Sequence, residues 1–155
     1  ELAKKNDEQL TIFRRRNIGF IFQNYNLVPM LNVYENIVLP VELDGDIVDQ
    51  KFMDNVVMML GLEDKLNNMP NNLSGGQQQR AIARALITKP AIVLADEPTG
   101  NLDSKTSSDV IGLLKRTSVE FHQTIVMITH NDDIARLADR IIRIEDGKIT
   151  GGMEL

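Results

Sequence analysis

Two short, uninterrupted apolar runs constrain the fold of this chain more than any other feature. They are Ala91 to Ala95 (AIVLA) and Thr124 to Thr129 (TIVMIT). Continuous apolar strands are typical of a parallel sheet buried on both faces. A helical pattern from Asp103 to about Ser118 lies between them, with an apolar inner face formed by Val110, Ile111, Leu113 and Leu114. This order predicts an α/β fold with a mostly parallel sheet.

The first half of the chain predicts one more strand and a helical insertion. Asn17 to Phe22 (NIGFIF) is predicted to be a buried strand that ends at Gln23. From residue 24 to 72 the pattern is helical, most clearly over Val48 to Leu60, where Gly61 provides a stop signal. That helix has five apolar residues on one face: Phe52, Met53, Val56, Val57 and Leu60. We expect three parts: residues 1–23, a helical subdomain over 24–72, and residues 73–155.

The third part begins with a helix, predicted from Ser74 to about Thr88 and ended by Pro90. After the second apolar run come a short helix over Asp132 to Ala138 and a strand over Arg140 to Ile144. A turn over residues 145–148 follows.

Size and charge exclude several classes of protein. The 155 residues suit one domain, and 43% hydrophobic with 25% charged residues is ordinary for a globular protein. A net charge of −5 argues against general nucleic-acid binding. The absence of cysteine excludes disulfides and thiolate metal sites. No apolar run approaches the ~18 residues that a membrane-spanning helix needs, so we expect any membrane role to come through a partner.

Two acidic residues, Asp96 and Glu97, directly follow the first apolar run. The carboxyl ends of parallel strands form the edge where ligands bind in open α/β sheets. Asp96 is suited to Mg²⁺, which takes few carboxylates beside phosphates and waters. Glu97 is suited to orient and polarise an attacking water. A solvated Asp-Glu-Pro turn would give the same letters.

Three other features are weaker when taken singly. Ser74, Gly75, Gly76 and Gln77 open a helix, where free N–H groups and the helix dipole favour an anion, although an ordinary N-cap would also fit. His130 follows the second apolar run and could bind a phosphate or hold a water, although a histidine there is usually structural. Gln23 ends its strand with an amide that could reach Mg²⁺ or water.

Together these residues resemble the ABC ATPase family in order and spacing, over essentially the whole chain. The matches are Gln23 (Q-loop), residues 73–77 (signature motif), residues 92–97 (Walker B), residues 100–103 (D-loop) and His130 (switch histidine). Phrases such as LSGGQQQR, LADEPTGNLDS and ITHNDDIARLADRIIRIEDGKI are similar to ATPases of macrolide export, lipoprotein release and antimicrobial-peptide export.

The resemblance implies a partial P-loop NTPase fold, with ATP and Mg²⁺ as cofactors. It implies that Glu97 and His130 are catalytic and that Asp96 and Gln23 serve the metal. The nucleotide contacts that it implies are Gln23, Ser74, Gly75, Gly76, Gln77 and Asp103. It also implies a head-to-tail dimer beneath a membrane permease, at the cytoplasmic face of the cell membrane. Residues 27–43 align with the region that receives the permease, although their apolar side chains could equally form the subdomain's own core.

Two departures from the family bear on activity. The family's phosphate-binding loop, Gly-x-x-x-x-Gly-Lys-[Ser/Thr], does not occur in the 155 residues, and the chain opens on Glu1. We therefore expect a fragment that hydrolyses ATP negligibly alone. Arg80 also joins Ala81 directly, where the family has one more apolar residue. Losing a residue rotates a helix by ~100°, so we expect either a distorted helix or a misaimed signature motif.

Two alternatives stay open. One is an ABC ATPase that acts on the ribosome or DNA; only 50 residues (24–73) separate Q-loop from signature, without heptads, which disfavours the DNA-repair type. Copurification with a permease rather than ribosomes would distinguish them. The other is a non-catalytic interaction fragment, which the intact Asp96, Glu97 and His130 disfavour.

Overall fold

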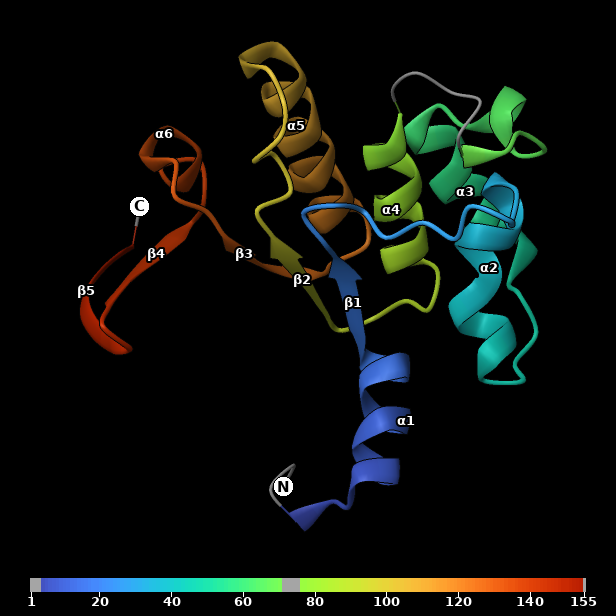
Figure 1. The fold of residues 1–155 in the computed structure, drawn as a ribbon, viewed down its shortest axis with the longest axis horizontal. Helices are drawn as coiled ribbons and strands as arrows, with labels where there is room; N and C mark the ends of the chain where they lie inside the picture. The colour runs from blue at the N-terminus through green and yellow to red at the C-terminus, as the bar shows by residue number, and fades with distance from the viewer. Residues whose placement is uncertain (1–3, 71–75, 155) are drawn as a thin grey trace.

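The computed structural model describes residues 4–70 and 76–154, and its centre is a parallel sheet (Figure 1). Three strands, β1 (Ile18–Ile21), β2 (Ile92–Asp96) and β3 (Thr124–Ile128), lie in the order β1-β2-β3. Both pairings are parallel, with Ile18 opposite Ile92 and Ile92 opposite Thr124. The predicted α/β fold with a mostly parallel sheet is confirmed. Because β2 is central, its carboxyl end lies between those of β1 and β3.

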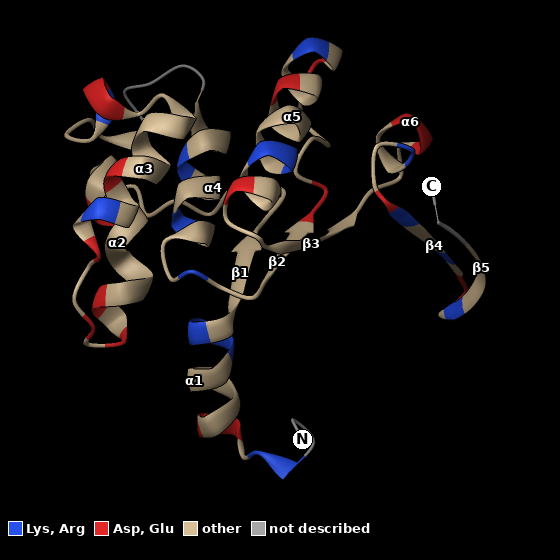
Figure 2. Ribbon diagram, turned by 180° about the vertical axis from the view of Figure 1, so that it is seen from behind, with Lys and Arg blue, Asp and Glu red and all other residues tan. Residues whose placement is uncertain are grey.

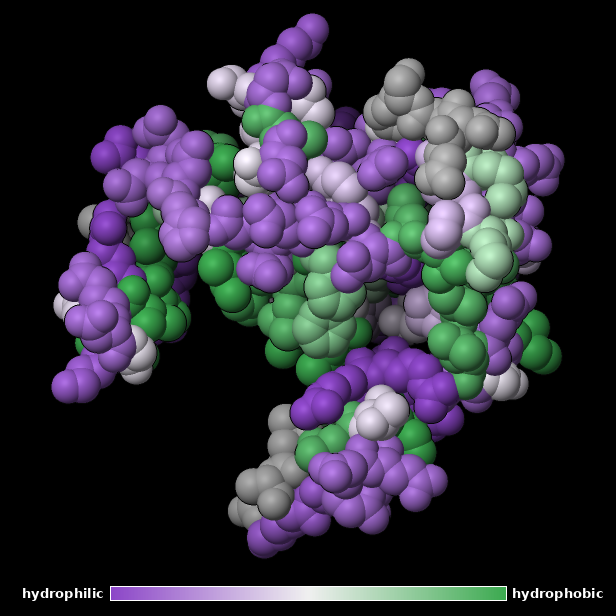
Figure 3. Space-filling model, viewed as in Figure 1, coloured by the Kyte–Doolittle hydropathy of each residue, from purple (hydrophilic) through white to green (hydrophobic). Residues whose placement is uncertain are grey.

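Only one face of this sheet is covered by the described helices. α4 (Gln77–Leu86) packs against β1, and α5 (Ser104–Glu120) packs against β3. The covered side chains include Ile21, Val93 and Ala95, each at most 2% exposed. The other face exposes apolar side chains that Figure 3 shows gathered over the sheet: Phe20, Phe22, Ile92, Val126 and Ile128. The prediction that these strands are buried on both faces is therefore wrong for the described chain.

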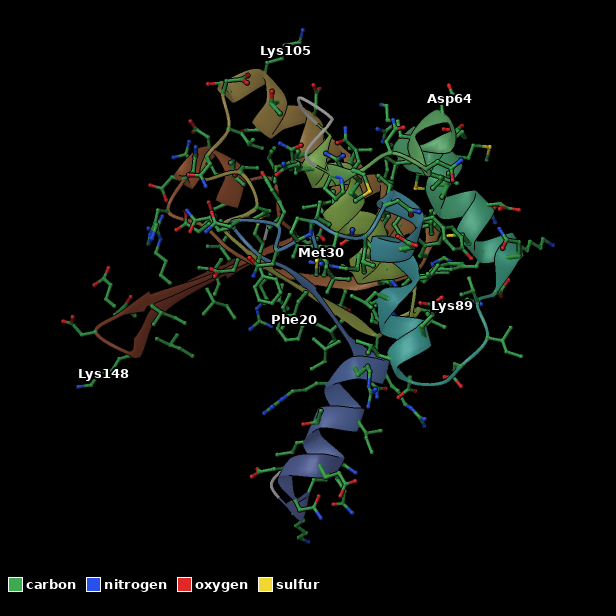
Figure 4. All side chains as sticks on the ribbon, turned by 45° about the vertical axis from the view of Figure 1, so that its right-hand side comes forward. Phe20, Met30, Asp64, Lys89, Lys105 and Lys148 are labelled. Atoms are coloured by element: carbon green, nitrogen blue, oxygen red, sulfur yellow. The ribbon has the colours of Figure 1, made fainter. Side chains whose placement is uncertain are left out.

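A group of helices lies on the α4 side of the sheet. α2 (Val33–Leu43), α3 (Gln50–Leu60) and the 3₁₀ turn η2 (Glu63–Lys65) belong to it. In α3, four of the five predicted inner residues are buried and Phe52 packs partly buried against the core, while Gly61 ends the helix at φ 63°. Within residues 27–43, Val33 is fully buried and Met30 is 82% exposed, so Val33 belongs to the core (Figure 4).

A buried amide fixes the segment that leads into α2. Asn36 is completely buried, and its side-chain nitrogen donates to the carbonyl oxygens of Val28, Leu31 and Asn32. Its side-chain oxygen accepts from the N–H of Val28 at 2.7 Å. A buried amide stabilises a fold only when it is paired in this way, so Asn36 specifies one path for this segment.

The helix α1 (Asp7–Asn17) was not predicted from the sequence. Asn6 and Gln9 form a capping box, and acidic first-turn and basic last-turn residues complement the helix dipole (Figure 2). No residue of α1 is buried, and Arg15 reaches Asp44 with Nε 3.2 Å from Oδ1. Asn17, predicted to begin the strand, is instead the last residue of α1.

The C-terminal part forms a separate antiparallel hairpin. Its strands are β4 (Arg140–Glu145) and β5 (Lys148–Glu154), and the second was not predicted. Asp146 and Gly147 form the predicted turn with φ of 49° and 73°, as a two-residue hairpin requires. α6 (Asp132–Ala135), which precedes the hairpin, is shorter than predicted.

None of the helices within residues 4–70 and 76–154 has the length and apolar character needed to cross a membrane.

Candidate functional site

The carboxyl ends of the three parallel strands meet at one edge of the sheet (Figure 1). Gln23 follows β1, Asp96 and Glu97 lie at the end of β2, and His130 follows β3. Parallel strands bring residues that are distant in sequence to a single edge, where ligands bind in such sheets.

The backbone conformation of Glu97 determines the direction in which the chain leaves β2. Glu97 has φ of 44°, a left-handed conformation that costs a non-glycine residue about 1–3 kcal/mol. Its N–H donates to the carbonyl of Ile128 at 3.0 Å, and its own carbonyl accepts from the N–H of Gly100 at 3.0 Å. These bonds attach the turn after β2 to the end of β3, and they offset the strain at Glu97.

Glu97 and His130 are in direct contact. His130 Nε2 lies 2.7 Å from Glu97 Oε1. The Glu97 side chain is 21% exposed, whereas that of His130 is 89% exposed. The imidazole therefore lies on the outer side of the carboxylate and can meet a ligand that approaches this edge.

Gly100 is the point where Gln23 and Glu97 approach each other. A Cβ placed on Gly100 would lie 3.1 Å from Gln23 Nε2 and 3.1 Å from Glu97 Oε2. Only glycine leaves both side chains in these positions without displacement. Asn101 Nδ2, next in the chain, lies 3.5 Å from Asn24 Oδ1, so the same two loops meet twice. The structure thus brings Gln23, Glu97 and His130 together.

Asp96 precedes Glu97 in the chain and lies on the open face of the sheet. It is exposed and shares the open face of β2 with Ile92, because alternate residues of a strand point the same way. Figure 2 shows acidic residues where β2 ends. Carboxylate oxygens from this strand end are therefore available to a ligand on the open face.

Asp103 caps α5 with its carboxylate. Its Oδ1 accepts from the N–H groups of Lys105 and Thr106 at 3.0 Å, and its Oδ2 accepts from the Thr106 hydroxyl at 2.7 Å. The backbone bond from Thr106, followed by its hydroxyl bond, lowers the pKa of Asp103. The described contacts of this carboxylate are thus to its own helix.

Part of the predicted anion site lies outside the described residues, namely Ser74 and Gly75. Gly76 is the N-cap of α4 with φ of 77°, and Gln77 is its first residue. Among the described residues, no hydrogen bond or ion pair joins Gly76 or Gln77 to the Gln23–Glu97–His130 cluster. α4 is α-helical throughout Gln77–Leu86, so the direct Arg80–Ala81 link causes no break there.

Reasoning from the sequence did not find the contact role of Gly100. The available signal was a glycine in the turn directly after an acidic pair, but one of its two neighbours, Gln23, belongs to a loop 77 residues earlier.

A family model described as "ABC transporter" matches residues 3–100, which include Gln23, residues 76–77 and Asp96–Glu97. The chain is 46% identical over 147 residues to "Macrolide export ATP-binding/permease protein MacB" of Syntrophobacter fumaroxidans, covering 92% of this chain and 21% of that protein. It is 45% identical over 155 residues to "Lipoprotein-releasing system ATP-binding protein LolD 1" of Rhodopseudomonas palustris, covering 97% of this chain and 69% of that protein.

A solved structure matches the fold at a TM-score of 0.81 and 40% identity, over 97% of this chain and 68% of the other. It is a dimeric post-hydrolysis state of an ATP-binding cassette from Methanocaldococcus jannaschii, bound to ADP and Pi. The chain therefore spans only part of each of these proteins, from 21% to 69% of their length.

Proposed function

Because the chain belongs to the ABC transporter family, we propose that it forms most of an ATP-binding subunit that couples ATP hydrolysis to membrane export. One observation carries this proposal: Gln23, Glu97 and His130 come from three separate segments and meet at Gly100 and the Glu97 carboxylate. The names of the relatives, which include macrolide export and lipoprotein release, support export as the task.

In this proposal Glu97 orients the attacking water and accepts its proton. Its carboxylate is held by the His130 contact at 2.7 Å and by the fixed backbone of the turn. A general base needs this kind of fixed position at hydrogen-bond reach. His130, whose side chain is mostly exposed, forms a hydrogen bond with the γ-phosphate. Gln23 responds to whether nucleotide is bound in the site, because its amide already lies beside Glu97.

The donor set fits Mg²⁺. Asp96 supplies an exposed carboxylate and Gln23 an amide oxygen, and no group of three metal-ligating side chains occurs within residues 4–70 and 76–154. Mg²⁺ is commonly bound by one or two carboxylates together with substrate phosphates and waters, so a sparse set is suitable. A cation held by these two side chains would offset the negative charge of the phosphates and of the Asp96 carboxylate.

The same residues do not fit the triphosphate unaided. Asp96 and Glu97 are acidic, and the Gly-Lys-[Ser/Thr] pattern that binds β- and γ-phosphates is not among the 155 residues. We propose that these residues alone bind ATP weakly and hydrolyse it negligibly. In this proposal Ser74, Gly75, Gly76 and Gln77 contact nucleotide held by the opposite subunit of a head-to-tail dimer. Asp103 is a further proposed nucleotide contact.

The partners proposed are a membrane permease and a second ATPase subunit, with the protein at the cytoplasmic face of the cell membrane. The dimeric state of the similar cassette supports the second partner. The exposed Met30, in the loop before α2, is one apolar side chain available to the first.

The test joins residues 1–155 to a segment of the lipoprotein-releasing relative that supplies the family's phosphate-binding loop, Gly-x-x-x-x-Gly-Lys-[Ser/Thr]. This chimera is expected to hydrolyse ATP, and Glu97→Gln is expected to lower kcat by about 10²–10⁴-fold, the range of a general base. ATP binding, measured separately, is expected to persist. Glu145→Gln, at the exposed end of β4, is the matched control.

Unchanged hydrolysis in Glu97→Gln would contradict the role given to Glu97. A chimera that folds and binds ATP but never hydrolyses it would contradict the enzymatic function.

A further inference from the structure

The loop after β1 contains two consecutive residues in a left-handed backbone conformation. Tyr25 has φ of 59° and Asn26 has φ of 44°. Neither is glycine, and this conformation is unfavourable for residues with a Cβ. It persists only where neighbouring groups hold it, so the contacts of these two residues identify what holds the loop.

Arg84 of α4 binds the carbonyl oxygens of both residues. Its Nη2 lies 2.6 Å from the carbonyl oxygen of Tyr25, and its Nη1 lies 2.6 Å from that of Asn26. These bonds cross 59 and 58 residues of sequence. Burial lowers the pKa of the Arg84 guanidinium, because the charged group has lost part of its water shell. The two carbonyl dipoles take the place of that water. The planar guanidinium thus matches the two carbonyls that the left-handed pair presents.

α4 is itself fixed relative to the strand that precedes this loop. A Cβ on Gly19 of β1 would overlap the carbonyl oxygen of Ala85, the residue after Arg84. The Tyr25 ring is buried, and its hydroxyl is hydrogen-bonded to the side chain of Gln78, also in α4. Arg84 therefore acts from an element that cannot shift independently of β1.

Gln23 lies two residues before the left-handed pair. Its amide nitrogen lies close to Gly100 and Glu97, and Asn24 next to it contacts Asn101. The path of the chain from Gln23 to Asn26 therefore links the Arg84 contacts to the site.

We propose that Arg84 is a positioning residue, which holds Tyr25 and Asn26 in the left-handed conformation and thereby keeps Gln23 against Gly100 and Glu97. Its importance for hydrolysis rests on the proposed function, but its effect on the loop does not. The two are separable, because the loop geometry can be measured without nucleotide.

Arg84→Lys tests the geometry rather than the charge. A lysine ammonium is a single point donor and cannot reproduce the two parallel N–H groups of a guanidinium. Arg116→Lys, exposed in α5, is the matched control, since it makes the same change in side chain on another helix.

The experiment uses nuclear magnetic resonance of the labelled 155-residue chain. The Gln23 side-chain amide is expected to show a cross-peak to the Gly100 α-protons in the wild type and in Arg116→Lys. In Arg84→Lys the ratio of closed to open loop is expected to fall about tenfold, the order for one lost charge-assisted hydrogen bond. Cross-peaks between Gly19 and Ala85 are expected to remain, because they report the β1–α4 contact alone.

Adding Asn26→Gly separates positioning from a general structural role. Glycine adopts positive φ at no steric cost, so the double variant is expected to regain the Gln23–Gly100 cross-peak. If Arg84→Lys alone does not fold, the double variant is expected to fold. An unchanged cross-peak in Arg84→Lys, or a double variant without rescue, would overturn the proposal.

Discussion

The two faces of the parallel sheet differ sharply although the same three strands form both. On the covered face, Ile21 and Val93 are 2% and 0% exposed. On the open face, Phe20, Val126 and Ile128 are 37%, 49% and 60% exposed, and Figure 4 shows Phe20 projecting away from α2. Packing in the described chain is therefore concentrated on one side, and apolar surface on the other remains in contact with solvent.

The candidate site lies at the border between these two faces. The Arg84 contacts hold the loop that carries Gln23 from the covered side, whereas His130 follows β3 and its side chain is 89% exposed. Large contiguous apolar surfaces are rare on soluble proteins and commonly mark an interaction site. The backbone of the site therefore depends on the covered face, and we expect the open face to contribute little to folding.

The largest expected effect is a truncation on the covered side. Ile82→Ala, in α4 at 1% exposure, is expected to destabilise the chain by about 2–5 kcal/mol, because it leaves a cavity in packed surroundings. Ile128→Ala makes the same change on the open face and is expected to cost less than about 1 kcal/mol. Urea unfolding of both variants measures the difference. Equal losses would show that the open face also carries folding energy.

A smaller effect is expected from overpacking where α4 meets β1. Gly19→Ala places a methyl group on the Ala85 carbonyl oxygen and is expected to cost about 1–3 kcal/mol. Gly112→Ala, in α5, meets no atom within 4 Å and is expected to be neutral or stabilising by up to about 1 kcal/mol. Urea midpoints of the two variants give the comparison. A harmless Gly19→Ala would mean that α4 can move away from β1, which would weaken the basis for the Arg84 proposal.

Much of the sheet and its helices could be predicted from the sequence, because apolar periodicity determines which residues form an element. It does not determine what covers an element. The run from Ala91 to Ala95 predicts a strand buried on both faces, yet Ile92 is 39% exposed here. One local signal, the Asn6–Gln9 capping box, precedes a helix that was not predicted. The Asp146-Gly147 turn was predicted, but the strand β5 that follows it was not.

The candidate site could likewise be predicted only in part. Polar residues at the ends of apolar runs mark Gln23, Glu97 and His130 as candidates, since parallel strand ends meet at one edge. The contacts at Gly100 and Arg84 arise between segments about 60–80 residues apart and have no local pattern. Such contacts require the packed structure, because tertiary neighbours decide which glycine must stay small and which arginine meets two carbonyls.

The smallest effect concerns Asp103, the N-cap of α5. This end of the helix is exposed to solvent, whereas the apolar side of α5 packs on the covered face of the sheet. Hydrogen bonds from Thr106 lower the pKa of Asp103 below its value of about 3.9 in unfolded chains. A lowered folded pKa means that the contribution is present above the unfolded pKa and disappears as pH falls through the folded one. Asp103→Ala is expected to lower Tm at neutral pH by less than Ile82→Ala does.

Asp103→Asn separates the cap from the charge. Asparagine also accepts N–H bonds at an N-cap, so Tm at neutral pH is expected to stay near that of the wild type. The fall in wild-type stability below about pH 4 is expected to be reduced in this variant, because its side chain does not titrate. Asp109→Asn, exposed in the same helix, is the control for a change in charge alone. An Asp103→Asn variant with the full wild-type pH dependence would show that this carboxylate does not stabilise α5 through its charge.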